Sequence, residues 1–175
     1  MLQMLKSTLF LTVALLGLSA PAAAADAPTD PQIAHIAYTA GSIDVAAGKQ
    51  ALAKSHNKAV RSFAQEMVRD HSAVNAKALA LVKKLHVTPQ DNPTSEALTK
   101  AATAERDKLG HLSGAAFDRA YVDNEVAFHK TVNGALESTL IPSAKNDQLK
   151  SLLETGLTLF REHQAHAEQI AKALK

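Results

Sequence analysis

The sequence predicts an all-α protein that folds as a bundle of long helices. Its composition favours helix, with abundant Ala, Leu and Lys, an aromatic share of 4% and no Trp. No segment shows sustained alternation of β-branched residues with a period of two, so we expect no strand. Apolar residues instead recur at helical spacing along four segments of about 25 residues each. With a shorter, more polar segment, they predict an antiparallel four-helix bundle with one additional short helix.

The first two long helices are predicted over residues 31–55 and 58–85. Asp30 can serve as an N-cap before Pro31 at the first helical position, and Asn57 can cap the second helix. The apolar face of the first helix consists of Ile33, Ile36, Ala40, Ile43 and Ala47. The apolar face of the second consists of Val60, Phe63, Met67, Val74, Ala78, Leu81 and Leu85.

Three more helices are predicted in the second half of the chain. Residues 88–94 form a linker, because the two prolines in it stop helix on either side. A polar helix over 95–109 ends at Gly110, and a long helix over 114–140, which Ser113 can cap, ends before Pro142. The last helix begins at residue 146 or 147. Its apolar face consists of Leu149, Leu153, Gly156, Phe160, Ile170 and Leu174.

The N-terminus predicts export from the cytoplasm. Lys6 precedes an apolar run from Leu9 to Leu18, and small residues follow in the stretch SAPAAAAD. This order is typical of a secretory signal peptide, and we expect cleavage after Ala25 or one or two residues earlier. A membrane-spanning helix needs about twice that apolar length, so we expect no stable membrane span after cleavage. We therefore predict a signal peptide at 1–25 and a single domain at 26–175, located in the periplasm or secreted.

Charge and cysteine content restrict the chemistry that is available. The formal net charge of +2 comes from interspersed residues, and the basic stripe expected of a nucleic-acid-binding protein is missing. The chain has no cysteine, which excludes disulfides, a thiol nucleophile and a thiolate metal site. No catalytic motif is recognisable, so we do not expect a classical enzyme, and protein partners and oligomerisation stay open. Any functional site must therefore use histidine and carboxylate groups.

Three of the predicted long helices place a histidine on their apolar face. His71 falls between Met67 and Val74, His129 follows two valines at helical spacing, and His163 falls after Phe160. The first helix offers Asp44 beside its apolar face. Facing helices of a bundle can bring such side chains to one point, as a metal site requires. We predict metal ligation by Asp44, His71, His129 and His163.

Further polar residues accompany these four, namely Glu66, Asp70, Glu125, Glu162 and His166. Glu125 precedes His129 by four residues, a spacing that places both side chains on one helix face. We expect this group to supply alternative ligands or partners that orient the ligands. Two other interpretations stay open, a buried polar network that only fixes helix register and a proton-transfer site without metal.

Residues 41–85 also carry a family resemblance. They contain a glycine and an acidic residue before a G-K-x-A-L stretch, followed by the pattern F-A-x-x-M-V-x-D-H-x-x-x-N. An F-D-x-x-Y stretch, His129 and His163 follow further on. In these features the chain resembles the exported bacterial domain-of-unknown-function family 4142 over nearly all of residues 31–173. The matching positions are Gly41, Asp44, Gly48, Lys49, Phe63, Ala64, Met67, Val68, Asp70, His71, Asn75, Phe117, Asp118, Tyr121, His129 and His163.

The resemblance implies a ferritin-like bundle, a class that often holds a di-iron carboxylate centre. The chain departs from that pattern, because Glu125 and Glu162 each lie four residues before a histidine rather than three. A mononuclear or histidine-rich site for a divalent or iron-type ion fits better, and zinc, iron, copper and nickel all suit imidazole and carboxylate ligands. We therefore expect metal handling or a role in oxidative or envelope stress. The alternative is a non-enzymatic envelope-stress or interaction protein whose histidines form a structural polar network.

Overall fold

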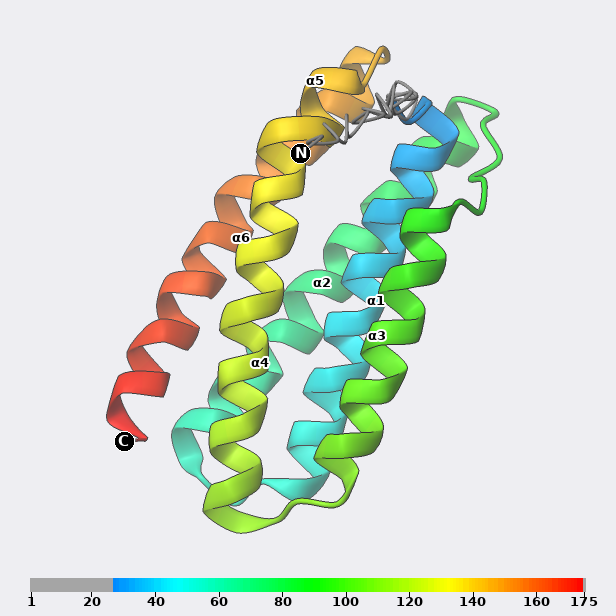
Figure 1. Cartoon of the computed structure of the whole chain (residues 1–175). Coiled ribbons are helices and arrows are strands. Elements are labelled where there is room, and N and C mark those ends of the chain that lie inside the picture. The colour runs from blue at the N-terminus through cyan, green and yellow to red at the C-terminus, as the bar shows by residue number, and fades with distance from the viewer. Residues whose placement is uncertain (1–26, 175) are drawn as a thin grey trace, which may run out of the picture.

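The computed structural model describes residues 27–174 and contains helices but no strand in that range (Figure 1). The predicted all-α bundle is thus confirmed, whereas the ferritin-like detail and the domain boundaries stay predictions. The expected signal peptide at 1–25 lies outside the described residues. The elements are α1 (Asp30–Lys54), α2 (Lys58–Lys84), α3 (Pro93–Gly110), α4 (Gly114–Ala135), a π-helical turn η1 (Leu136–Leu140), α5 (Ile141–Ser143) and α6 (Asp147–Ala173).

Four long helices, α1, α2, α4 and α6, form the bundle. The contacting pairs are α1 with α2, α2 with α6, α6 with α4 and α4 with α1, and the colours of Figure 1 show that each of these pairs runs antiparallel. Helix α3 is the additional helix and lies against α1. It returns the chain along the length of the bundle, so that α4 runs in the same direction as α2 (Figure 1).

Side-chain caps fix where most of these helices begin. The Asn57 side chain accepts hydrogen bonds from the backbone amides of Ala59 and Val60, as predicted, and Asn146 caps α6 in the same way. Asp30 is not the N-cap of α1, because Thr29 precedes the helix instead. The Asp30 carboxylate accepts from the backbone amides of Lys145 and Asn146 at 2.8 and 2.9 Å. It therefore joins the start of α1 to the start of α6.

The end of α4 differs from the prediction. The helix does not stop before Pro142 but passes through the π-helical turn into α5, which ends at Ser143. In this turn the Ile141 amide donates to the carbonyl of Leu136, five residues back. Pro142 falls in the first turn of α5 and, having no amide hydrogen, donates no backbone hydrogen bond at this point of the continuous helix.

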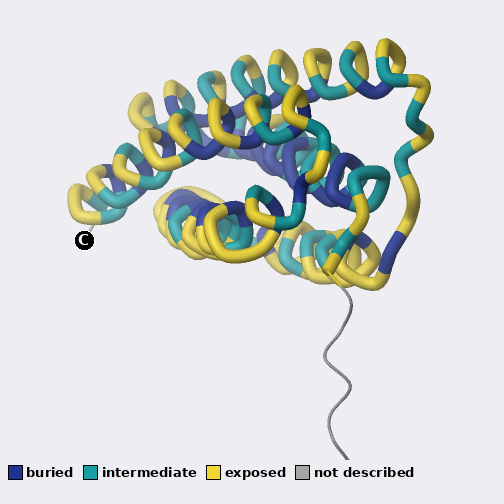
Figure 2. The backbone as a smooth tube through the Cα atoms, turned by 90° about the horizontal axis from the view of Figure 1, so that it is seen from above, coloured by how far each residue is buried: buried dark blue, intermediate teal, exposed yellow. Residues whose placement is uncertain are grey.

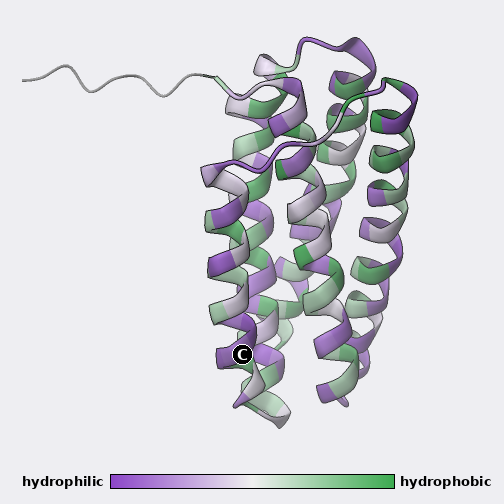
Figure 3. Ribbon diagram, turned by 90° about the vertical axis from the view of Figure 1, so that its right-hand side faces the viewer, coloured by the Kyte–Doolittle hydropathy of each residue, from purple (hydrophilic) through white to green (hydrophobic). Residues whose placement is uncertain are grey.

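Buried residues line the inner faces of the helices, where Figure 2 shows the dark-blue segments turned toward one another. Polar and apolar residues alternate along each helix (Figure 3), as expected for amphipathic helices around a core. The core has two apolar clusters, one around Phe63 and Phe117 and one around Ile33 and Leu153. Within residues 27–174, no helix combines the length and the apolar character needed to cross a membrane.

Candidate metal centre

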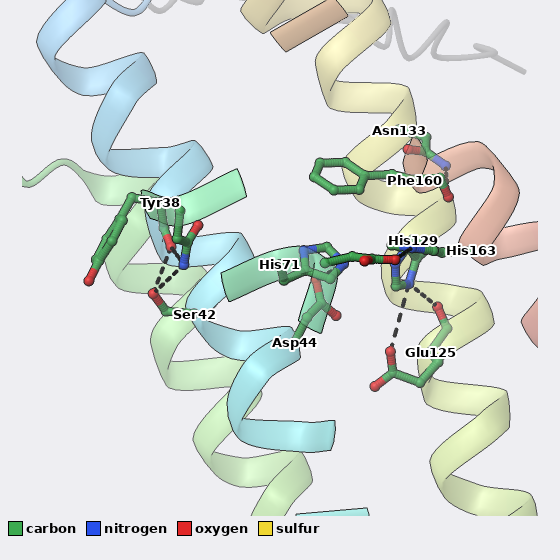
Figure 4. A network of polar contacts seen from close by, with 11 residues as sticks. Tyr38, Ser42, Asp44, His71, Glu125, His129, Asn133, Phe160 and His163 are labelled. Atoms are coloured by element: carbon green, nitrogen blue, oxygen red, sulfur yellow. Dashed lines mark hydrogen bonds and ion pairs between the residues drawn. The ribbon is translucent and has the colours of Figure 1, made fainter. Parts of the chain in front are cut away.

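A buried polar group occurs on the four bundle helices at positions between those of the two apolar clusters. Asp44 belongs to α1, His71 to α2, Glu125 and His129 to α4, and His163 to α6. Each of the five has a relative exposure of 2% or less. Figure 4 shows Asp44 and His71 extending toward the histidines of α4 and α6. Ionisable side chains are rarely this deeply buried without a partner or a bound ion, so this group is the candidate site.

The three histidines converge as the sequence predicted. His71, His129 and His163 can each offer one ring nitrogen such that the three atoms lie within 4.8 Å of one another. Their ring centroids are 5.2–5.6 Å apart. A separation of this size allows three nitrogens to approach one ion at bond lengths of about 2.0–2.1 Å.

His129 and His163 each hydrogen-bond to the protein through one ring nitrogen, whereas His71 makes only a longer contact with a carboxylate. The Nδ1–H of His129 donates to the backbone carbonyl of Glu125 at 3.0 Å, and the Nε2–H of His163 donates to the Asp70 carboxylate at 3.1 Å. The Nε2 of His71 lies 3.4 Å from Oδ2 of Asp44. Acceptors of this kind fix the tautomer and orientation of histidines that bind metals.

The opposite nitrogen of each ring has no hydrogen-bond partner in the protein. These atoms are Nδ1 of His71, Nε2 of His129 and Nδ1 of His163, all of them buried, and Nε2 of His71 is likewise buried without a hydrogen bond. Burial lowers the pKa of His71 to about 2, with the neighbouring His129 adding to the effect, and it lowers the pKa of His129 to about 4. Burial likewise lowers the pKa of His163. The three rings are therefore neutral near pH 7, the form that binds a metal.

Two buried carboxyl groups adjoin the histidines. Asp44, Glu125 and His129 form a second group whose candidate ligand atoms lie within 4.8 Å of one another. Burial raises the pKa of Glu125 to about 8, and burial together with the charge of Glu125 raises the pKa of Asp44 well above its usual range. The pair therefore retains at least one proton near neutral pH. The hydroxyl of Tyr121 is also buried and unpartnered, and burial together with these carboxyl groups raises its pKa.

A third group lies toward the surface. Glu66 and Asp70 are partly exposed, and with His163 they form another set of candidate ligands. Arg69 binds both oxygens of Asp70, at 2.6 and 2.8 Å, and holds the pKa of that carboxyl below its usual range. The Nδ1 of His166 contacts Glu66 at 2.7 Å. Asp70 is thus an ionised acceptor for the His163 ring.

The structure places the predicted residues in distinct roles. Asp44 contacts His71 and does not join the three histidines in one set of ligand atoms. Glu66, rather than Glu162, is the partner of His166, and Glu162 is exposed on α6. Phe160 was expected only as a core residue, yet its ring stacks on His71 with a centroid distance of 4.7 Å. The three-residue spacing of Phe160 and His163 on one helix face was the available signal.

Fold and site together define a helical bundle with a buried histidine–carboxylate group. Residues 17–170 match the family described as Domain of unknown function (DUF4142), and the chain belongs to that family. A solved structure with a similar fold is that of a DUF305 protein from Streptomyces coelicolor, described as secreted. It is 12% identical, has a TM-score of 0.59, and the match covers 82% of this chain and 87% of that one. No functionally curated protein matches the chain.

Proposed function

We propose that this protein is an exported metal-binding protein whose ion is held by His71, His129 and His163. The observation that carries the proposal is the pairing pattern of the ring nitrogens. Each ring has at least one buried nitrogen without a hydrogen-bond partner, while His129 and His163 hydrogen-bond to the protein through their other nitrogen and His71 only approaches Asp44. A buried polar atom without a partner costs about 1–3 kcal/mol, and an ion bound by such a nitrogen would remove that cost.

The donor set limits which ions fit. Three neutral imidazoles suit zinc, copper, iron and nickel, and they are poor ligands for magnesium and calcium, which prefer oxygen. Three protein ligands also leave a coordination position for water or another molecule, unlike the closed four-ligand sites of structural zinc. This arrangement supports a role in metal handling or oxidative-stress defence. Asp44, Glu125 and Asp70 would orient the rings and balance the charge of the ion.

The second candidate is a non-enzymatic bundle whose polar residues only fix the helix register. It is supported by two amide side chains that join neighbouring helices. Asn75 donates to the Ser42 hydroxyl at 3.1 Å between α2 and α1, and Asn133 donates to Gln164 at 3.0 Å between α4 and α6. If the polar residues form only such a network, a His71→Leu variant should have unchanged or higher stability, because apolar packing can often replace buried polar groups. It does not account for the unpartnered ring nitrogens of the three histidines.

Metal analysis of the protein purified from the cell envelope tests the proposal. We expect close to one equivalent of a transition metal per chain, and loss of it in His71→Ala and His163→Ala. His111→Ala is the matched control, because it removes an exposed imidazole outside the site. Wild-type protein that stays metal-free after exposure to zinc, copper, nickel and ferrous iron would refute metal binding and favour the network.

Export is tested separately. The signal-peptide pattern supports a location outside the cytoplasm. The absence of cysteine is consistent with it, because thiol ligands would be oxidised there. The intact mass of the protein from the periplasmic fraction should correspond to a chain that begins at Asp26 or one to two residues earlier. Full-length protein retained in the cytoplasm would contradict export and leave the metal proposal untouched.

A further inference from the structure

A cavity of about 600 Å³ lies in the part of the bundle that contains the Ile33–Leu153 cluster. Its walls come from all four bundle helices, from η1 and from the N-terminal end of α3. Cavities that hold small molecules in proteins range over about 300–1,000 Å³. The size of this one is therefore that of a ligand pocket rather than of a packing defect.

Small side chains create the space. Ala37, Ala40, Ala78, Ala135 and Gly156 line it from α1, α2, α4 and α6, where larger residues would fill the interior. The other half of the core is filled by Phe63, Met67, Phe117 and Tyr121, each with a relative exposure of 0%. The cavity opens to the surface, where Thr94, Thr131 and Thr139 are exposed, so its apolar wall is in contact with water and a bound molecule would cover it favourably.

Two features connect the cavity with function. The π-helical turn η1 forms part of the wall through Leu136, Thr139 and Leu140, and π-helical turns occur frequently at functional sites. Phe160 lines the cavity while its ring stacks on His71. A molecule in the cavity would therefore lie one aromatic ring away from the histidine group.

The lining identifies the chemical class of the occupant. Charged residues make up 21% of the chain, yet none of the described residues around the cavity is charged. Aliphatic side chains predominate, and the polar members are uncharged amides and hydroxyls such as Gln32, Asn92 and Thr94. A carboxylate, phosphate or ammonium group would lose its hydration here without a counter-charge. Water is also a poor filling, because it needs two to four polar partners per molecule.

We propose that this cavity binds an uncharged, largely apolar small molecule. The inference goes beyond the proposed metal function and does not depend on it. The amide and hydroxyl groups can satisfy one neutral polar group of the ligand, while the aliphatic wall covers its apolar body. Binding removes apolar surface of both partners from water, which stabilises the folded chain by mass action.

The test uses the full-length gene product, as processed by the cell and stripped of metal with a chelator, and the neutral fluorescent dye Nile red. We expect saturable binding, and displacement by decan-1-ol at concentrations at least about tenfold lower than by decanoate or decylammonium, because only the charged chains lose a hydrated head group. Equal displacement by all three, or no saturable binding, would overturn the proposal. Because metal is absent, this result is independent of the metal analysis.

Variants that fill the cavity provide a second measurement. Ala78→Leu and Ala135→Leu add volume from opposite helices, and each should weaken Nile red binding at least about tenfold at unchanged helicity, because the added side chain occupies ligand space. Ala101→Leu, on the exposed face of α3, is the control and should bind like wild type. Unchanged binding in both filling variants would place the dye elsewhere and overturn the assignment. If the protein instead forms a dimer in which a second copy covers the cavity and excludes the dye, the assignment of the cavity to a small molecule is overturned as well.

Discussion

Replacing Asp70 with alanine isolates the contribution of one orienting contact to metal affinity. The Asp70 carboxylate accepts from Nε2 of His163 at 3.1 Å and is kept ionised mainly by Arg69. Removing partners of this kind costs metal sites 10–100-fold in affinity, or about 1.4–2.7 kcal/mol. Arg69 already neutralises part of the Asp70 charge, so we expect the lower end of that range, about tenfold.

The assay is competition for zinc against a chromophoric chelator at neutral pH. Glu162→Ala is the matched control, because it removes an exposed carboxylate next to His163 in sequence that accepts no hydrogen bond from the ring. We expect this control to change affinity by less than about twofold, as is usual for a solvent-screened charge. Wild-type affinity in Asp70→Ala, or an equal loss in Glu162→Ala, would refute the reasoning from the hydrogen bond.

Three further predictions concern stability. Phe63→Ala should lower the free energy of unfolding by about 3–5 kcal/mol in urea titrations, since the ring is fully buried, and a loss below about 1.5 kcal/mol would contradict the packing described. Gly41→Ala should destabilise by about 1–3 kcal/mol, because its Cβ would meet the Asn75 side chain, and an Asn75→Ala background should remove most of that penalty in a double-mutant cycle. The metal-free protein should lose stability as the pH falls below about 6.5. In this range a histidine of the unfolded chain binds a proton, whereas His71 in the folded protein, with a pKa of about 2, stays neutral. Glu125 acts in the opposite direction, since with a pKa of about 8 it keeps a proton that the unfolded chain releases above about pH 4.5. Denaturation at pH 3, 6 and 8 should therefore show the highest stability at pH 6, and His71→Leu should reduce the loss at pH 3.

Local patterns were sufficient to predict the helices. Asn57, Asn146 and the apolar spacing located α2 and α6 to within a residue or two, because caps and amphipathic periodicity are properties of short segments. The predicted start of α1 was wrong by one residue, since the Asp30 carboxylate accepts hydrogen bonds from amides more than 100 positions away instead of capping its own helix. The passage of the helix through Pro142 was also unforeseen, because a π-helical turn has no strong sequence signature.

The candidate site was predictable where each residue could be judged alone. A histidine on an apolar face is unusual, so His71, His129 and His163 were recognisable singly, and their convergence followed from the bundle. Their partners were not predictable, because the helix pairing decides them. Asp70 contacts a ring 93 positions away and Glu66 one 100 positions away, whereas the local spacing had pointed to Glu162 for His166.

The approach of α1 to α2 shows how the sequence sets the geometry of the site. A Cβ at Gly48 would lie 2.9 Å from Cγ2 of Val68 and 3.0 Å from the carbonyl of Ala64, and a Cβ at Gly41 would meet Asn75. Glycine inside a helix costs about 1 kcal/mol, so two such residues on one face require a compensating benefit. Asp44 lies between them on α1, and the close packing on both sides brings its carboxylate to 3.4 Å from the ring of His71. The two glycines therefore influence the site by setting the distance between α1 and α2. This distance decides which acidic side chain fits between α1 and the ring of His71. A glutamate at position 44 would be one methylene too long for the same contact.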